Sequence, residues 1–184
     1  MFDNLWVEKY RPKKLEDFCI SEKSNFLNFL TKCKDDNEIP NLLLVGNPGI
    51  GKTTIAKIIV NELLECDHLY INASDENGID TIRSKVTSYA RTKSLFDIKV
   101  IILDECDGLT QDGQRALRNV MEEYSAITRF ILTANYKHRI IPALQSRCQT
   151  FDINHDKTPI VSRLVHIGEK EKVSCKLSDV QKVV

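Results

Sequence analysis

The sequence predicts an α/β fold in which helices flank a parallel five-stranded sheet, followed by the start of a small helical domain. Short β-rich apolar runs alternate with amphipathic helical patterns, which is typical of a parallel sheet covered on both faces. The pattern changes near residue 155, and only helical spacing follows. We therefore predict one domain over residues 1–154 and part of a second, helical domain over residues 155–184.

The sheet is expected to contain five strands, each a short apolar run. These runs are residues 41–45, 68–72, 99–103, 129–133 and 148–153. Three segments between them repeat apolar residues at i, i+3 and i+4, which predicts helices that each lay one face on the sheet. They are residues 52–65, 78–91 and 111–124.

The last part of the chain contains signals for two more helices. Thr158 and Pro159 are a favourable helix start, and the apolar stripe that follows comprises Ile160, Leu164, Val165 and Ile167. Ser178 can cap another helix, of which the sequence holds about one turn. We interpret this region as the beginning of a second, helical domain.

Composition excludes several classes of protein. The chain has 26 basic and 26 acidic residues, so its formal net charge is zero and any contact with nucleic acid requires a local basic patch. No segment approaches the roughly 18 apolar residues of a membrane span, and the N-terminus lacks the apolar stretch of a secretory signal. We expect an intracellular protein, cytoplasmic or nuclear, without membrane contact.

The six cysteines are scattered and form no CxxC pair. This spacing argues against a zinc site, and we expect the cysteines to be reduced thiols that are mostly structural. They are Cys19, Cys33, Cys66, Cys106, Cys148 and Cys175.

A phosphate-binding loop is the strongest chemical signal. Residues 46–53 match G-x-x-x-x-G-K-[ST] between an apolar run and a helix, which is the context that a P-loop NTPase requires. Backbone N–H groups of such a loop surround phosphates at a helix N-terminus, and the lysine reaches the β- and γ-phosphates. The expected nucleotide-binding residues are Gly46, Asn47, Pro48, Gly49, Ile50, Gly51, Lys52, Thr53 and Thr54.

Two carboxylates end the strand over residues 99–103. Asp104 is expected at the carboxyl edge of the sheet, where it and the Thr53 hydroxyl can hold Mg²⁺. Glu105 is placed to polarise an attacking water, so the pair favours ATP hydrolysis over transfer to another acceptor. The alternative is that both acids only solvate the end of a strand.

Asn135 ends the next strand at the same edge. Its amide can position water or sense the γ-phosphate of ATP. Asparagine at a strand end is more often a turn residue, so this assignment depends on its place after the strand that ends in Asp104.

The order of these and other short motifs resembles the replication factor C small subunits and related clamp loaders, which are AAA+ ATPases. The resemblance covers nearly the whole chain, and the opening Trp6–Pro12 and the Ser146-Arg147-Cys148 triplet are its most specific parts. The motifs are residues 6–12, 46–54, 72–80, 103–107, 114–118, 121–122, 133–135 and 144–148.

The resemblance implies further roles in an ATP site. The opening motif of the family packs around adenine, which implicates Val7, Tyr10, Arg11 and Pro12. Arg147 matches the family's arginine finger, which acts in trans on ATP bound by the neighbouring subunit and so implies an oligomer. A solvated basic arm and a surface ion pair are the plainer interpretations of these two features.

The resemblance also implies contact with the backbone of DNA. The matching positions are Ile79, Arg83, Lys85 and Arg118. Arg83 and Lys85 do not share a helix face, so both are not expected to contact phosphate. A solvated helix face explains them equally well.

Together these observations favour an ATPase subunit of a clamp loader, with ATP and Mg²⁺ as cofactors. Its implied partners are other subunits of a pentamer, a ring-shaped sliding clamp and primer–template DNA. The family's arginine in the helical lid and its helical collar have no counterpart in the sequence. Two alternatives follow: a nucleotide-binding regulatory paralogue that does not hydrolyse ATP, and another DNA-handling AAA+ ATPase such as a helicase loader.

Overall fold

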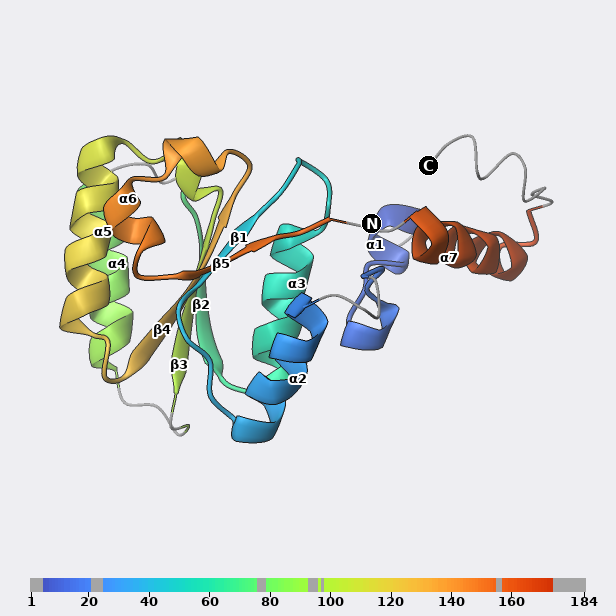
Figure 1. Cartoon of the computed structure of the whole chain (residues 1–184), viewed down its shortest axis with the longest axis horizontal. Coiled ribbons are helices and arrows are strands. Elements are labelled where there is room, and N and C mark those ends of the chain that lie inside the picture. The colour runs from blue at the N-terminus through green and yellow to red at the C-terminus, as the bar shows by residue number, and fades with distance from the viewer. Residues whose placement is uncertain are drawn as a thin grey trace.

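Five parallel strands form the centre of the molecule (Figure 1). The computed structural model describes residues 5–20, 25–75, 79–92, 96, 98–154 and 157–173. The strand order is β2-β3-β4-β1-β5, with every neighbouring pair parallel, so the predicted fold class is confirmed. The strands are β1 (Leu42–Val45), β2 (Asp67–Asn72), β3 (Lys99–Asp104), β4 (Thr128–Ala134) and β5 (Gln149–Asp152).

Helices cover both faces of this sheet. Figure 1 shows α4 and α5 on one face, α2 and α3 on the other, and α1 with α7 beyond the end of β5. The helices are α1 (Trp6–Lys9), α2 (Asn25–Asp36), α3 (Lys52–Ile58), α4 (Ile79–Arg91), α5 (Gln111–Glu123), α6 (Pro142–Gln145) and α7 (Lys157–Lys170). None of those in the described part of the chain has the length and apolarity needed to cross a bilayer.

Strand β3 shows why the runs are continuously apolar. Ile101 and Leu103 pack into the core beneath α4 and α5, whereas Val100 and Ile102 pack into the core beneath α2 and α3. Successive side chains of a strand point to opposite faces, so a strand buried on both faces needs apolar residues at every position. The strands are thus packed on both faces, and the site is built on the ends of these strands.

Two elements differ from the prediction. Helix α2 was not predicted, although its buried residues Phe26, Leu30 and Cys33 have helical spacing. The helix predicted over residues 52–65 changes at Ile59 into a π-helical segment, Ile59–Leu63. The helix start predicted at residue 178 lies outside the described residues.

Helix α7 and Glu171, the residue after it, contact the N-terminal segment over residues 5–20. Lys9 Nζ lies 2.5 Å from Glu171 Oε1, and Arg163 donates to Asp17 across 2.7 Å. Figure 1 shows α1 and α7 side by side, apart from the sheet. The predicted domain boundary near residue 155 stays a prediction.

The described cysteines are free thiols. Burial raises the pKa of Cys106 and brings that of Cys148 to about 12, so both stay protonated at neutral pH. Cys175 lies outside the described residues.

Candidate active site

The phosphate-binding loop and the ends of three strands meet at one edge of the sheet, the carboxyl rim, where the parallel strands end. The loop follows Val45 of β1, and β1 lies between β4 and β5. The Gly46 amide donates to the carbonyl of Ala134, the last residue of β4 (3.3 Å). Helix α3 begins at Lys52, so its N-terminus and the loop face the same side.

Lys52 lies at the centre of this rim with only 7% of its surface exposed. Its ammonium donates to the Gly46 and Asn47 carbonyls (2.9 Å each) and to Oδ1 of Asn135 (2.7 Å). Burial lowers the pKa of Lys52, and nearby carboxylates, Asp104 foremost, oppose that shift. These three acceptors are neutral, so none of them balances the charge of the buried ammonium.

Asp104 ends β3 directly opposite the start of α3. Its side chain is 6% exposed, and both oxygens lie 2.8 Å from the Thr53 hydroxyl. The Thr133 hydroxyl donates to Oδ1 (2.6 Å) and the Tyr70 hydroxyl to Oδ2 (2.9 Å). A buried carboxylate next to a hydroxyl supplies the oxygen ligands that Mg²⁺ prefers.

The described residues contain no cluster of three His, Cys, Asp or Glu side chains that could hold a metal by itself. Thr53 and Asp104 fit the other mode of Mg²⁺ binding, in which few protein groups act together with waters and substrate phosphates. Burial, and then the hydrogen bond to Asp104, raises the pKa of Tyr70, so its hydroxyl remains a donor.

Glu105 has an unusual backbone conformation, with φ 56° and ψ 44°. Its amide donates to the Thr133 hydroxyl (2.9 Å), and its carboxylate accepts from the Ser74 hydroxyl (2.5 Å). A non-glycine residue in the left-handed region is uncommon and is often associated with a functional site. The two adjacent acids differ in exposure, because the Asp104 side chain is buried and Glu105 is exposed.

Asn135 is held in place by Asp107, which sequence reasoning missed. The two carboxylate oxygens of Asp107 accept from the amides of Asn135 and Tyr136, at 3.2 Å each. The roles of Thr133, Tyr70 and Ser74 were missed as well. Thr133 and Asp107 belong to recognised motifs, but their hydrogen bonds depend on the register of β3 against β4.

Gly51 precedes α3 with φ +88°, and a Cβ there would lie 2.8 Å and 2.9 Å from atoms of the Phe18 ring. We expect Gly51→Ala to lower the free energy of unfolding by about 2 kcal/mol or more, through backbone strain and overpacking. Gly49 has φ +80° but nothing within 4 Å of its Cβ position, so Gly49→Ala isolates the strain. Urea denaturation should show the larger loss for Gly51→Ala. Equal losses would contradict a role for Phe18.

The residues assigned to adenine lie on the N-terminal segment, in and just after α1. Val7 is 76% exposed, and Pro12 is half-buried. Arg11 donates to the Thr54 hydroxyl (3.3 Å) and pairs with Glu8. The structure thus brings Arg11 to the start of α3, whereas the hydroxyl of Tyr10 donates to Glu171, just after α7 (2.5 Å).

Arg147 lies at the opposite edge of the sheet, the amino rim, where the strands begin. It lies two residues before the start of β5, and Asn41, just before β1, donates to its carbonyl (3.3 Å). Its guanidinium pairs with Glu122 of α5 and donates to the Ala143 carbonyl. The structure therefore shows the surface ion pair of the plainer interpretation. It also places Arg147 at the opposite rim from Lys52 of its own chain, as action in trans requires.

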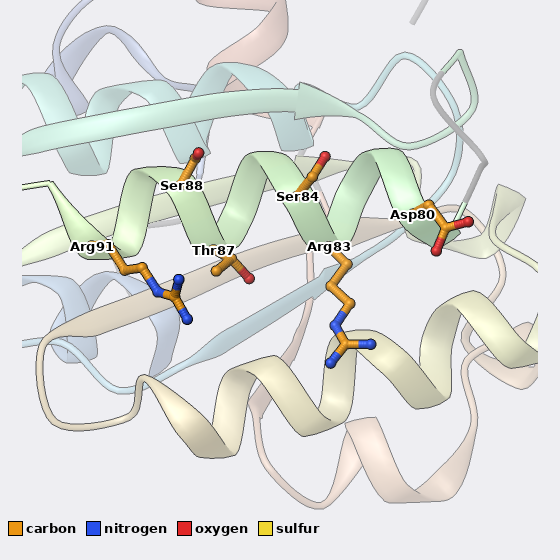
Figure 2. Close-up of a pocket in the computed structure, with 6 residues that line it drawn as sticks. All are labelled: Asp80, Arg83, Ser84, Thr87, Ser88 and Arg91. Carbon is orange, nitrogen blue, oxygen red and sulfur yellow. The ribbon is translucent and has the colours of Figure 1, made fainter.

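The residues assigned to DNA lie on or near α4 and α5. Arg83 and Arg91 line a groove along α4, and Figure 2 shows both side chains extending toward the neighbouring helix. Arg91 donates to the hydroxyl of Tyr124 at the end of α5 (3.3 Å). Lys85 does not line this groove, as the helical spacing predicted. Arg118 is half-buried on α5 and donates to Asn119, and the Ile79 side chain lies outside those described.

Comparison with known proteins adds two kinds of relative. The family model described as the ATPase family associated with various cellular activities (AAA) matches residues 42–154. A replication factor C small subunit from Staphylothermus marinus is 46% identical over 92% of this chain, and one from Methanococcus maripaludis is 43% identical over 97%. The chain spans 53% and 58% of those two relatives, a little over half of their length.

A solved structure shares the fold. The Thermotoga maritima RuvB Holliday junction branch migration motor superposes with a TM-score of 0.74 and 21% identity, covering 94% of this chain and 58% of that one. This likeness supports the architecture of the sheet and its helices.

Proposed function

Because the chain belongs to the AAA family of ATPases, we propose that it binds ATP with Mg²⁺ and hydrolyses it. The observation that carries the proposal is the meeting of Lys52, Asp104 and Asn135 at the carboxyl rim, with Thr53 hydrogen-bonded to Asp104. A loop of amides, a buried ammonium and a buried carboxylate at one helix N-terminus are complementary to a magnesium-bound triphosphate.

Each residue has a separate part in this proposal. Residues 46–54 surround the phosphates, and the Lys52 ammonium, released from the Asn135 amide, pairs with the phosphate oxygens. Thr53 and Asp104 would hold Mg²⁺, which would neutralise charge on the phosphates. Glu105 accepts a proton from the attacking water, and Asn135 orients that water or the γ-phosphate. Val7, Tyr10, Arg11 and Pro12 line the adenine side.

We propose further that the protein acts as a clamp-loader subunit. The support is its 42–46% identity to proteins named replication factor C small subunit. The partners would be other subunits of a pentamer, a sliding clamp and primer–template DNA, and the protein would work where DNA is replicated, in the cytoplasm or nucleus. Residues 155–184 would begin the lid over the nucleotide.

The DNA contact is assigned to the basic groove on α4. Arg83 is the strongest of the four predicted positions, because it lines the groove, extends toward the neighbouring helix (Figure 2) and has no ion pair in the described structure. Backbone contacts of this kind bind phosphate regardless of sequence, and their strength falls steeply with salt. Lys85 and Arg118 do not line the groove and are weaker candidates.

The proposal is tested by ATP hydrolysis in the intact protein mixed with its companion subunits. Hydrolysis should rise when primer–template DNA and the clamp are added together. Nucleotide binding with no hydrolysis under all these conditions would favour the regulatory alternative. Hydrolysis that responds to DNA but never to a clamp would favour another DNA-handling ATPase.

Arg147 supplies a separate prediction about assembly. Because it lies at the amino rim, we expect Arg147→Ala to leave ATP binding by its own chain unchanged and to reduce hydrolysis in the assembly about 10³-fold. Arg115→Ala, at an exposed arginine on α5, is the control and should keep full activity.

A mixing experiment separates action in trans from action in cis. Arg147→Ala chains retain Glu105, and Glu105→Gln chains retain Arg147, so co-assembly can create sites with both groups. Partial recovery of hydrolysis on mixing supports action in trans. No recovery, despite normal assembly, contradicts it.

A further inference from the structure

Tyr70 contacts the proposed metal-binding carboxylate but has no part in the roles assigned above. It lies on β2, the edge strand, in register with Ile102 of β3. Its hydroxyl donates to Oδ2 of Asp104 across 2.9 Å. Neighbouring Ile71 is buried beneath α4 and α5, so Tyr70 points to the other face of the sheet, toward α3.

Helix α3 holds the ring of Tyr70 in place. Lys57 Nζ lies 4.6 Å from the centre of the ring, over its face. Lys57 follows Thr53 by one helical turn, so both side chains leave the same side of α3. Helix α3 therefore reaches Asp104 in two ways. Thr53 contacts the carboxylate directly, and Lys57, one turn later, contacts the Tyr70 ring, whose hydroxyl donates to the carboxylate.

The two oxygens of Asp104 have different fixed partners. Thr133 donates to Oδ1 and Tyr70 donates to Oδ2, while Thr53 contacts both. If Thr53 turns to Mg²⁺, as its proposed role requires, Thr133 and Tyr70 are left to fix the carboxylate. Groups that orient a metal ligand in this way commonly change metal affinity by about 10–100-fold when removed.

We propose that Tyr70 is a positioning residue for metal-dependent nucleotide binding. Its hydroxyl orients the Asp104 carboxylate toward Mg²⁺. A phenol ordinarily titrates near pH ~10, so at neutral pH Tyr70 donates to the carboxylate and adds no charge beside the metal. The inference rests on the proposed ATP site and adds a residue from the edge strand to it.

The test is Tyr70→Phe in the intact protein, with binding of a fluorescent ATP analogue as the readout. Mg²⁺ should strengthen binding of the analogue, and the Mg²⁺ midpoint is the concentration that gives half of this effect. In Tyr70→Phe this midpoint should rise about tenfold. The affinity for the analogue in EDTA, without Mg²⁺, should not change. A loss of structure alone would weaken nucleotide binding both with Mg²⁺ and in EDTA. Tyr89→Phe is the matched control, because the buried Tyr89 hydroxyl has no hydrogen-bond partner in the described structure.

A Mg²⁺ midpoint equal to wild type in folded Tyr70→Phe protein overturns the inference, as does wild-type binding that is indifferent to Mg²⁺. Failure of the wild-type protein to bind the analogue at all contradicts the proposed ATP site instead. Should thermal denaturation show that Tyr70→Phe does not fold, Lys57→Met takes its place, since it releases the ring and keeps the hydroxyl. It should raise the midpoint in the same direction, and an unchanged midpoint overturns the inference.

Discussion

Exchanging Glu105 for glutamine is expected to reduce ATP hydrolysis by about 10²–10⁴-fold while ATP remains bound, because the amide cannot accept the proton of the attacking water. The size and shape of the side chain are kept, so the backbone at φ 56° and the hydrogen bond from the Ser74 hydroxyl can persist. Single-turnover hydrolysis and nucleotide binding, measured on the same preparation, separate the chemical step from affinity.

The matched control is Glu123→Gln, the same chemical change at an exposed position of α5. It should hydrolyse ATP at the wild-type rate. Turnover of Glu105→Gln at the wild-type rate would remove Glu105 from the mechanism and leave the water to be activated by another group.

Replacing Lys52 by alanine should weaken ATP binding about 100-fold, the equivalent of roughly 3 kcal/mol for lost charge-assisted contacts to phosphate. The variant also loses the donor that joins Asn135 to the loop carbonyls of Gly46 and Asn47. Isothermal titration with ATP and with adenosine distinguishes these effects, since only the triphosphate should lose affinity.

Lys34→Ala serves as the control, because Lys34 is an exposed lysine on α2. If Lys52→Ala lost affinity for adenosine as much as for ATP, the cause would be a collapsed loop and not a lost contact to phosphate. Unchanged affinity for ATP would contradict the proposed site altogether.

The central residues of the candidate site could be recognised in the sequence because each belongs to a local pattern. Lys52 and Thr53 lie in a loop motif, and Asp104 and Asn135 end apolar runs, so a parallel sheet brings them to one edge. The structure places them there, with Thr53 2.8 Å from Asp104 and Lys52 2.7 Å from Asn135. The five strands followed from the same reasoning about buried runs.

The residues that orient this centre could not be recognised in the same way. Tyr70 meets Asp104 only because β2 pairs with β3 in one register, and Thr133 meets it through the register of β4. A shift of either strand by one residue would turn these hydroxyls to the other face of the sheet. Packing of α7 on the N-terminal segment joins residues 162 positions apart, such as Lys9 and Glu171, and no local pattern encodes it.

The placement of Arg147 at the amino rim and Lys52 at the carboxyl rim has a geometric consequence for any assembly that uses both. A contact that brings one chain's arginine to another chain's phosphates joins two different surfaces, so the interface is head-to-tail. The same rotation then relates each subunit to the next. Such a chain of subunits ends either in a closed ring or in an open spiral. In an open spiral, one terminal subunit keeps an ATP site that no neighbour completes, and its nucleotide should outlast all the others.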